Sequence, residues 1–432
     1  MHTILAIFVN RSLTFVVYRL ALLRRLNLKP QTQNVKPNER MDAYIVAGYR
    51  SPVGKAPRGG LRLTRPDDMA AEVIKHLLNQ VPDLDPARVE DLIVGNAVPE
   101  AEQGMQIARY IALLSLPQSV PGMTINRYCG SGLEAIAIAS AKIHAGLADC
   151  IIAGGTESMS LVPVMGWKTA LNYEIAQKNP DYYIGMGLTA EQVAQQFTIS
   201  RDAQDEFAYE SHQKALAAQA SGKFAGEIVP INVSETYFDA ESGKKKTRTW
   251  SVAQDEGPRK DTSAEGLAKL KPVFAAGGSV TAGNSSQTSD GAAFVLVMSE
   301  RLVNELGVQP VARMVSYATA GVEPKIMGIG PVAAIPLALK KAGMQQNDIE
   351  QIELNEAFAA QSLAVIQELD LDRSKINPNG GAIALGHALG STGARLSVQL
   401  INEMRRRDQK YGMVSACVGG GQGVAGIFER LN

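Results

Sequence analysis

Strand-like and helix-like segments alternate along the chain, and one order of segments occurs twice. An apolar strand pattern at residues 41–52, MDAYIVAGYRSP, precedes apolar positions at helical spacing in residues 67–81 and a short apolar run in residues 90–100. The helix and strand patterns return in residues 331–343, PVAAIPLALKKAG, and residues 350–360, EQIELNEAFAA. This repetition predicts a duplicated α/β unit, in which each half is a mixed five-stranded sheet alternating with helices.

The two halves also match in the positions of their reactive residues. The predicted strands end in Asn96 and Asn355, and Cys129 and His387 follow them by 33 and 32 residues, each on a glycine-rich turn that opens a helix pattern. A pseudo-twofold relation between the halves brings these two turns together at the middle of the molecule. We therefore expect Cys129 and His387 to form a pair of nucleophile and base.

Cys129 lies just before a predicted helix, residues 132–145. The positive end of a helix dipole and the free N–H groups of its first turn favour a thiolate, so we expect a lowered thiol pKa. Taken alone, such a cysteine is more often a buried structural residue, and Cys150, within the run ADCIIAGG, keeps that interpretation. The histidines in polar helical stretches are also interpreted as structural; they are His76, His144 and His212.

A second cysteine, Cys417, is followed by a run of glycines in SACVGGGQG. Their amides are free of side chains and are suited to bind an anion. Asn355, at a strand end, is placed either to donate to an oxyanion or simply to cap a turn. Residues 421–426 match GxGxxG, but no helix or acidic residue follows in the manner of a dinucleotide site, so we reject that interpretation.

Composition sets the broad class. The chain has 432 residues, a net formal charge of zero and 45% hydrophobic residues, which suits a large soluble enzyme and gives no reason to expect nucleic acid as a partner. Three cysteines without paired spacing favour a reducing compartment over a disulfide framework. The sequence suggests no metal site.

The chain divides into an extension and two halves. From Met1 to Asn38 the chain holds six Lys or Arg residues and no acidic residue. Residues 1–40 are therefore interpreted as a targeting segment or as the product of a translation start assigned too far upstream. Their apolar runs are too short to span a membrane. We place the first half at residues 41–309 and the second at residues 310–432. Residues 162–272 are more polar and loop-like, which predicts a lid or a ligand-contact region rather than a core layer. The basic run Lys244 to Lys246 within them is expected at the solvated surface.

Six longer motifs together resemble the thiolase family, which includes acetyl-CoA acetyltransferases and 3-ketoacyl-CoA thiolases. They are INRYCGSGLEAI, GGTESMS, TAGNSSQTSDGAA, LNEAFAA, NPNGGAIALGHALGSTGAR and SACVGGGQG. The resemblance covers residues 41–432. It implies a thiolase-like fold of two βαβαβαββ halves in a five-layered α/β/α/β/α core with an inserted loop domain.

The resemblance also implies residue roles. Cys129 would be the acylated nucleophile, His387 its base, and Cys417 the acid/base at the α-carbon of acetyl-CoA. Asn355, through a water and with His387, would form one oxyanion hole, and the amides of Cys129 and Gly419 would form the other. The positions expected to contact the CoA part of the substrate are Ser286, Arg259, Met186 and Phe358.

Two positions depart from the family pattern. Ala388 stands where the motif GHP has proline, which we expect to loosen the turn without removing a catalytic group. Gly185 stands where the acetoacetyl-CoA-forming branch carries histidine, which favours cleavage of 3-ketoacyl-CoA in fatty-acid β-oxidation, with acetoacetyl-CoA formation as the alternative. A decarboxylating condensing enzyme would carry a second active-site histidine, and Asn355 at that position speaks against this alternative. A non-catalytic CoA-binding scaffold would lack one of the four catalytic residues, whereas this chain retains all four.

The family resemblance carries further expectations. CoA would be a substrate, with no bound cofactor. We expect a homodimer or homotetramer without a membrane span, and a hydratase/dehydrogenase partner is a further expectation. The location would be cytoplasmic, or mitochondrial or peroxisomal if residues 1–40 are a targeting segment.

Overall fold

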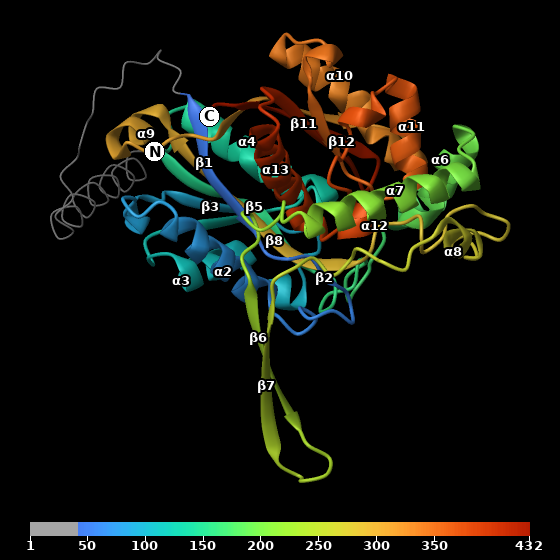
Figure 1. Cartoon of the computed structure of the whole chain (residues 1–432), viewed down its shortest axis with the longest axis horizontal. Coiled ribbons are helices and arrows are strands. Elements are labelled where there is room, and N and C mark those ends of the chain that lie inside the picture. The colour runs from blue at the N-terminus through green and yellow to red at the C-terminus, as the bar shows by residue number, and fades with distance from the viewer. Residues whose placement is uncertain (1–41) are drawn as a thin grey trace, which may run out of the picture. The chain divides into compact units, whose positions relative to one another are not determined.

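The computed structural model describes residues 42–432, and its first half is built on one mixed sheet (Figure 1). The strand order is β1-β8-β5-β3-β4, in which β3 runs parallel to β4 and β5 while β8 runs antiparallel to β5 and β1. A short strand, β2, pairs with β8. The strands are β1 Ala43–Arg50, β2 Gly54–Lys55, β3 Asp91–Gly95, β4 Gly122–Ile125, β5 Cys150–Ser158 and β8 Ser289–Ser299.

The second half carries the strand order β10-β11-β12-β9 and joins the first through a single bridge between Ile45 and Ala312. Its strands are β9 Ala312–Gly321, β10 Gln351–Leu354, β11 Tyr411–Val418 and β12 Gln422–Arg430. The expected fifth strand is reduced to one isolated bridge between Ile352 and Ile376. The strand ends there because Asn377 has a φ of +44° and its side chain takes over the pairing: its Oδ1 accepts from Leu354 N–H at 2.9 Å and its Nδ2 donates to Leu354 O at 2.8 Å.

Helices fill three layers around the two sheets. Separate apolar clusters join α2 and α3 to the outer face of the first sheet, α4 and α13 to the inner faces of both sheets, and α10 and α11 to the outer face of the second. These helices are α2 Pro66–Asn79, α3 Ile107–Ser115, α4 Ser131–His144, α10 Gly330–Ala342, α11 Ala359–Leu369 and α13 Leu389–Arg406. The five-layered α/β/α/β/α core is therefore confirmed. Two shorter helices complete this part, α9 Glu300–Leu306 and α12 Ala382–Leu385.

The position of each helix follows from its sequence. Helix α2 begins at Pro66, whose ring suits the first helical turn, and it buries one stripe that includes Met69, Val73 and Leu77. Helix α13 differs because it is buried on nearly every side from Leu389 to Ile401. A helix between two sheets has no solvent face, which explains its many small residues and its few charged ones.

The segment 162–272, expected to be loop-like, contains more regular structure than predicted. Its elements are α5 Tyr173–Lys178, α6 Met186–Gln196, α7 Arg201–Ala220, β6 Ile231–Phe238, β7 Lys245–Val252 and α8 Ala264–Ala268. Strands β6 and β7 form an antiparallel hairpin that extends away from the layers (Figure 1). Ile231, Val233 and Val252 anchor its base in the first-half core, whereas its outer residues are exposed.

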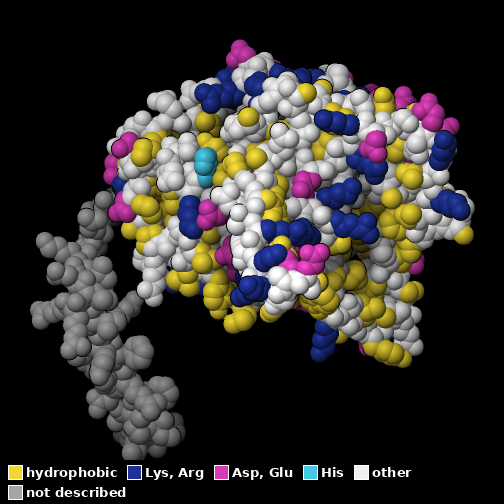
Figure 2. Space-filling model, turned by 60° about the horizontal axis from the view of Figure 1, so that its bottom comes forward, with side chains coloured by type: hydrophobic (Ala, Val, Ile, Leu, Met, Phe, Trp, Pro, Cys, Tyr) yellow, Lys and Arg dark blue, Asp and Glu magenta, His cyan; other side chains and the backbone are white. Residues whose placement is uncertain are grey.

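The basic run Lys244 to Lys246 lies at the end of this hairpin and is exposed, as predicted. On the face shown in Figure 2, basic, acidic and hydrophobic side chains are mixed, in keeping with the balanced charge of the chain. At the base of the hairpin, Arg50 is buried and pairs with two buried carboxylates, Glu227 at 2.8 Å and Asp255 at 2.7 Å.

Among residues 42–432, no helix combines the length and the apolar character that crossing a bilayer requires. The predictions for the extension, residues 1–40, fall outside the residues that the structure describes.

Candidate active site

Cys129 lies in a tight turn, Tyr128–Gly130, that leads directly into α4. Tyr128 adopts a φ of +41°, a conformation that non-glycine residues rarely take and that a functional site often retains. Gly130 has no room for a side chain, since an added Cβ would lie 2.9 Å from Val424 and 3.1 Å from Val418 of the second half. The turn is therefore pressed against the other half of the molecule, and Cys129 is only 8% exposed.

The environment of Cys129 raises the pKa of its thiol to about 12. Burial is the largest cause, and the negative charge of Glu157 acts in the same direction; hydrogen bonds from the backbone N–H groups of Gly419 and Cys129 itself oppose them. The expectation of a lowered pKa at a helix N-terminus is thus wrong, because desolvation of the sulfur outweighs the amides around it. The resting residue is a neutral thiol, and a base must remove its proton for the sulfur to attack.

His387 lies between α12 and α13, and its ring is buried with 5% exposure. Its backbone N–H donates to Gln287 O and to Ser289 Oγ, both at 3.1 Å. These bonds hold the turn without the proline that the motif GHP would supply. Burial, with a smaller contribution from the positive charge of Arg395, lowers the pKa of His387 to about 3. The imidazole is therefore neutral, with a lone pair on one ring nitrogen, and it is a weaker base than an exposed histidine.

Asn355 follows strand β10 and is fully buried. Its backbone N–H donates to Ser415 O of β11 at 2.9 Å, and its side-chain Nδ2 lies 3.4 Å from His387 Nε2. The Oδ1 atom of Asn355 is buried without a hydrogen-bond partner. A buried, unpaired carbonyl oxygen next to the histidine is suited to hold a water or a polar group of a ligand.

Cys417 lies near the end of β11 and has no exposed surface. Burial is the main cause that raises the pKa of its thiol, and electrostatic repulsion from Cys129 raises that pKa further. The two cysteines are therefore close enough for the charge of one to act on the other. Gly419 follows the same strand and directs its amide to the Cys129 sulfur, so the sequence-predicted residues Cys129, Cys417 and Gly419 are brought together.

Close packing of α4 against α13 brings the two turns to the same place. A Cβ at Gly132 would lie 2.6 Å from Ala394 N, and a Cβ at Gly393 would lie 2.3 Å from Leu133 N, so the helix backbones touch where they cross. Each glycine lies within the first two turns of a helix that carries a reactive residue at its N-terminus. The spacing of Cys129 and His387 predicted that their two turns meet, and this crossing is where the helices that follow them touch.

Buried Glu157, in β5, links the start of α13 to the segment that follows β3. Its carboxylate accepts from Ala97 N–H at 2.7 Å, Gln103 Nε2 at 2.7 Å and Gly390 N–H at 2.9 Å. The last of these donors belongs to the first turn of α13. Sequence reasoning missed this role, although Glu157 stands in the motif GGTESMS, where an acidic residue inside an apolar strand is the signal that could have found it.

Comparisons with known proteins give the arrangement a family. A sequence profile described as Thiolase, N-terminal domain, matches residues 43–301, and one described as Thiolase, C-terminal domain, matches residues 308–430. The chain belongs to the thiolase family.

Individual thiolases are similar over nearly their whole length. The 3-ketoacyl-CoA thiolase of Bacillus subtilis (strain 168) is 52% identical over 389 residues, which cover 90% of this chain and 99% of the relative. The peroxisomal 3-ketoacyl-CoA thiolase A of Mus musculus is 48% identical over 90% of this chain and 91% of its own length. Among solved structures, the acetyl-CoA acetyltransferase of Bacillus anthracis has a TM-score of 0.82 and 41% identity, and the match covers 91% of this chain and all of that one.

Three of the four positions expected to contact CoA lie near the thiolase cysteines. Phe358 shares a buried apolar cluster with Cys417, and Met186 packs against that cluster from the start of α6. Ser286 is partly buried, and its backbone N–H donates to Ala357 O at 2.9 Å, beside Phe358. Arg259 is different: it is exposed, its guanidinium pairs with Asp261 at 3.0 Å, and no contact in the described residues joins it to the cysteines.

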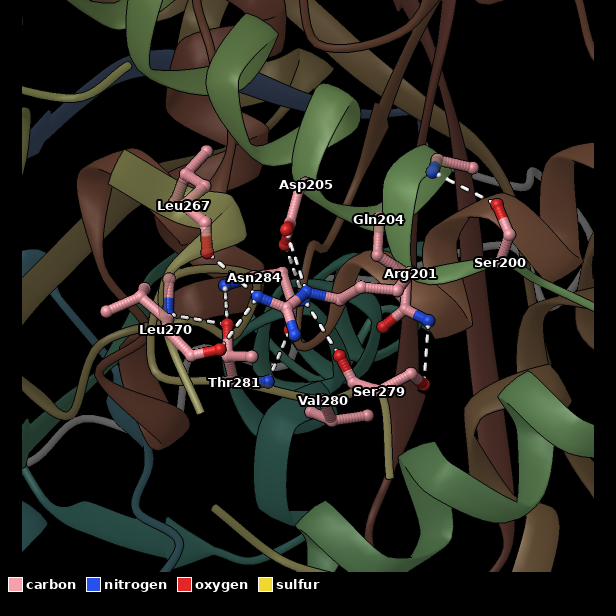
Figure 3. A network of polar contacts seen from close by, with 12 residues as sticks. Ser200, Arg201, Gln204, Asp205, Leu267, Leu270, Ser279, Val280, Thr281 and Asn284 are labelled. Atoms are coloured by element: carbon pink, nitrogen blue, oxygen red, sulfur yellow. Dashed lines mark hydrogen bonds and ion pairs between the residues drawn. The ribbon is translucent and has the colours of Figure 1, made fainter. Parts of the chain in front are cut away.

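The loop that carries Ser286 is fixed by a polar network that the sequence did not predict (Figure 3). Asn284 Nδ2 donates to Asp205 Oδ1 at 2.9 Å, and Arg201 on the same helix, α7, donates to that carboxylate at 2.7 Å. Arg201 also donates to the carbonyls of Leu267 and Leu270 at 2.8 and 2.9 Å. The network joins the inserted segment to the motif TAGNSSQTS, which explains why a polar motif follows the insertion.

Proposed function

We propose that the protein is an acyltransferase that cleaves 3-ketoacyl-CoA with free CoA, releasing acetyl-CoA and a shortened acyl-CoA in fatty-acid β-oxidation. The observation that carries the proposal is the pair of buried thiols, Cys129 and Cys417, whose charges act on each other. The segments of His387 and Asn355 adjoin them: Leu389, two residues after His387, packs in one apolar cluster with Cys129, and the Asn355 N–H donates to Ser415 O, two residues before Cys417. Relatives named 3-ketoacyl-CoA thiolase, at 43–52% identity, support this choice of substrate.

The first half-reaction uses both thiols. The proton of Cys129 passes to neutral His387, and the sulfur attacks the ketone carbon at position 3 of the substrate. The bond between carbons 2 and 3 breaks, its electron pair passes into the enolate of acetyl-CoA, and the Cys417 thiol protonates carbon 2. We assign the amides of Gly419 and Cys129 to stabilising negative charge formed next to Cys129. We assign Asn355, through a water and with His387, to stabilising the enolate oxygen.

The second half-reaction returns the enzyme to its starting state. Free CoA gives its thiol proton to the Cys417 thiolate, and the CoA sulfur attacks the acyl group on Cys129. The acyl-CoA leaves, and the Cys129 sulfur takes back the proton held by His387. The scheme predicts ping-pong kinetics, because acetyl-CoA leaves before CoA attacks.

Gly185 supports a proposal about the length of the acyl chain that the enzyme accepts. Gly185 is exposed, and a Cβ built there would meet no atom within 4 Å, at the position where histidine is expected in the acetoacetyl-CoA-forming branch. The absence of that histidine favours substrates longer than four carbons. Formation of acetoacetyl-CoA is the second candidate, supported by the structural similarity to the acetyl-CoA acetyltransferase of Bacillus anthracis.

The test is CoA-dependent cleavage by the purified protein across 3-ketoacyl-CoA substrates of four to sixteen carbons. We expect turnover of the longer substrates, and activity confined to four carbons would leave acetoacetyl-CoA chemistry as the function. Cys129→Ala should abolish both half-reactions, whereas Cys417→Ala should retain acyl transfer from a simple acyl-CoA to Cys129. Cys150→Ala is the matched control, since Cys150 is a buried thiol in the first-half core.

Assembly and location are also proposed. Strand β4 is the outer strand of the first sheet, and Leu113 and Leu114 of the neighbouring helix α3 are 46% and 45% exposed, which supports a homodimer or homotetramer that covers this edge. We propose a cytoplasmic location, or a mitochondrial or peroxisomal one if residues 1–40 target the protein. A hydratase/dehydrogenase partner remains part of the proposal, and mass measurement of the purified protein and of its complexes tests the assemblies.

A further inference from the structure

The imidazole of His387 faces one polar partner at each ring nitrogen. Nδ1 lies 2.7 Å from Thr392 Oγ1, and Nε2 lies 3.4 Å from Asn355 Nδ2. The backbone N–H of His387 is held by two acceptors, and the ring is buried, so it has little freedom to turn. A neutral imidazole carries one N–H, and its partners decide which nitrogen has it.

The partner at Nδ1 favours a proton there. The hydroxyl of Thr392 donates to Ala388 O at 2.8 Å, one turn back along the chain. A hydroxyl has a single proton, so this bond leaves only lone pairs on Oγ1 to face Nδ1. Oγ1 therefore accepts a hydrogen bond, and Nδ1 must be the nitrogen that donates it.

The partner at Nε2 selects the same form. Asn355 Nδ2 is a donor, and a donor is satisfied there only if Nε2 presents a lone pair. The opposite tautomer would need the Asn355 amide to be rotated and the Thr392 hydroxyl to turn away from Ala388. The Thr392 contact selects the proton position, and the Asn355 amide, as oriented in the structure, agrees with it.

We propose that Thr392 is a positioning residue of the general base: its hydroxyl accepts the Nδ1 proton of His387 and so holds the tautomer whose Nε2 lone pair can take the proton of Cys129. This inference rests on the role of His387 in the proposed function. The proton position itself is a property of the resting protein and is measurable without any substrate.

Arg395 supports this arrangement from the same helix. Its guanidinium donates to Gly386 O at 3.4 Å and to Gln399 Oε1, and it forms no ion pair with a carboxylate in residues 42–432. Its positive charge adds to burial in lowering the pKa of His387 to about 3. The ring is therefore neutral at physiological pH, and the location of its single N–H determines whether it can act as a base towards Cys129.

The experiment compares three variants by ¹⁵N NMR of histidine-labelled protein and by steady-state kinetics. Thr392→Val keeps the shape of the side chain and removes the hydroxyl, and Thr392→Ser restores the hydroxyl. Ser391→Ala is the matched control, because the Ser391 hydroxyl also donates to Ala388 O, at 3.1 Å, but does not touch the ring. The chain has five histidines, so the spectrum of a His387→Gln variant assigns the signal.

We expect the wild type, Thr392→Ser and Ser391→Ala to show His387 with its proton on Nδ1. Thr392→Val should move that proton at least partly to Nε2 and lower kcat by about 10- to 100-fold, with little change in KM. This loss is smaller than the full contribution of general base catalysis, about 100- to 10,000-fold, because only part of the histidine changes its tautomer. A wild-type spectrum with the proton on Nε2 would overturn the proposal, as would a Thr392→Val variant that loses kcat while its tautomer is unchanged.

Two further outcomes are distinguished. If Thr392→Val does not fold, the wild-type and Thr392→Ser spectra still decide the proton position. If the wild type shows the proton on Nδ1 but no thiolytic activity, the proposed function fails while the assignment of the tautomer stands.

Discussion

Gly393→Ala tests whether the crossing of α4 and α13 sets the geometry of the nucleophile and the base. A Cβ at this position would lie 2.3 Å from Leu133 N and 3.0 Å from Leu133 Cα, while ordinary contacts begin at 3.4 Å. The atoms that it meets belong to a helix backbone and cannot rotate away. The two helices must therefore move apart by about 1 Å at the crossing.

The displacement should affect catalysis more than stability. Leu133 follows Cys129 by four residues and Gly393 follows His387 by six, so separating the helices separates the reactive groups. A misplacement of about 1 Å can cost about 100-fold in rate, which corresponds to about 2.7 kcal/mol. Overpacking costs about 1–3 kcal/mol of stability, and the better helix propensity of alanine returns about 1 kcal/mol. The net loss of stability is thus about 0–2 kcal/mol.

The assay is kcat for CoA-dependent cleavage together with the free energy of unfolding in urea. Gly132→Ala should show a smaller effect in the same direction, because its nearest backbone atom, Ala394 N, lies 2.6 Å from the added Cβ. Gly226→Ala is the matched control, since a Cβ there meets no atom within 4 Å. A kcat for Gly393→Ala within twofold of the wild type would refute the inference that this crossing positions the catalytic groups.

Three further predictions concern reactivity, the histidine turn and the hairpin base. Alkylation of Cys129 by iodoacetamide should accelerate about tenfold per pH unit from pH 6 to 9, because its thiol pKa is about 12; a plateau within that range would contradict the burial argument. Ala388→Pro should retain activity and raise the free energy of unfolding by about 0.4–1 kcal/mol. Proline suits this position because φ at Ala388 is −76° and the preceding residue, His387, lies in an extended bridge with Thr288. A large loss of kcat would show that the turn needs alanine. Arg50→Met should cost about 3–5 kcal/mol, because Glu227 and Asp255 remain buried without their partner. Burial raises the pKa of Glu227 in the folded state, and Arg50 opposes that shift, so removing Arg50 should further disfavour the ionised form. The deficit in unfolding free energy should therefore be larger at pH 8 than at pH 5, and a deficit independent of pH would argue against buried charge as its cause.

Local patterns predicted the elements that depend on local sequence. The helix expected at residues 67–81 is α2, Pro66–Asn79, and the one expected at residues 331–343 is α10, Gly330–Ala342. The hairpin β6–β7 was missed, although Ile231 and Val233 alternate with polar residues. Its outer half is exposed on both faces, so the hydrophobic alternation that reveals a strand disappears after Val233.

Contacts between distant segments were harder to predict. The missing fifth strand of the second half depends on one asparagine, Asn377, whose side chain imitates a strand backbone. The helix after Cys129 was predicted and suggested a lowered pKa, but the burial that reverses this shift involves Val418 and Val424, almost 300 residues away. The matching positions of Cys129 and His387 in the two halves indicated that the halves meet. The same spacing could not show how completely the contact between the halves excludes water from Cys129.

The resting state of the site follows from this exclusion of water. Burial raises the pKa of Cys129 and lowers the pKa of His387, so both groups are neutral at physiological pH and no thiolate is stored. The Gly419 amide favours negative charge on the Cys129 sulfur but is not sufficient to create it. Negative charge would therefore develop as the sulfur attacks, where amide donors stabilise the transition state more than the ground state. Because oxidation of cysteine depends on thiolate character and exposure, the same neutrality protects a buried nucleophile between turnovers.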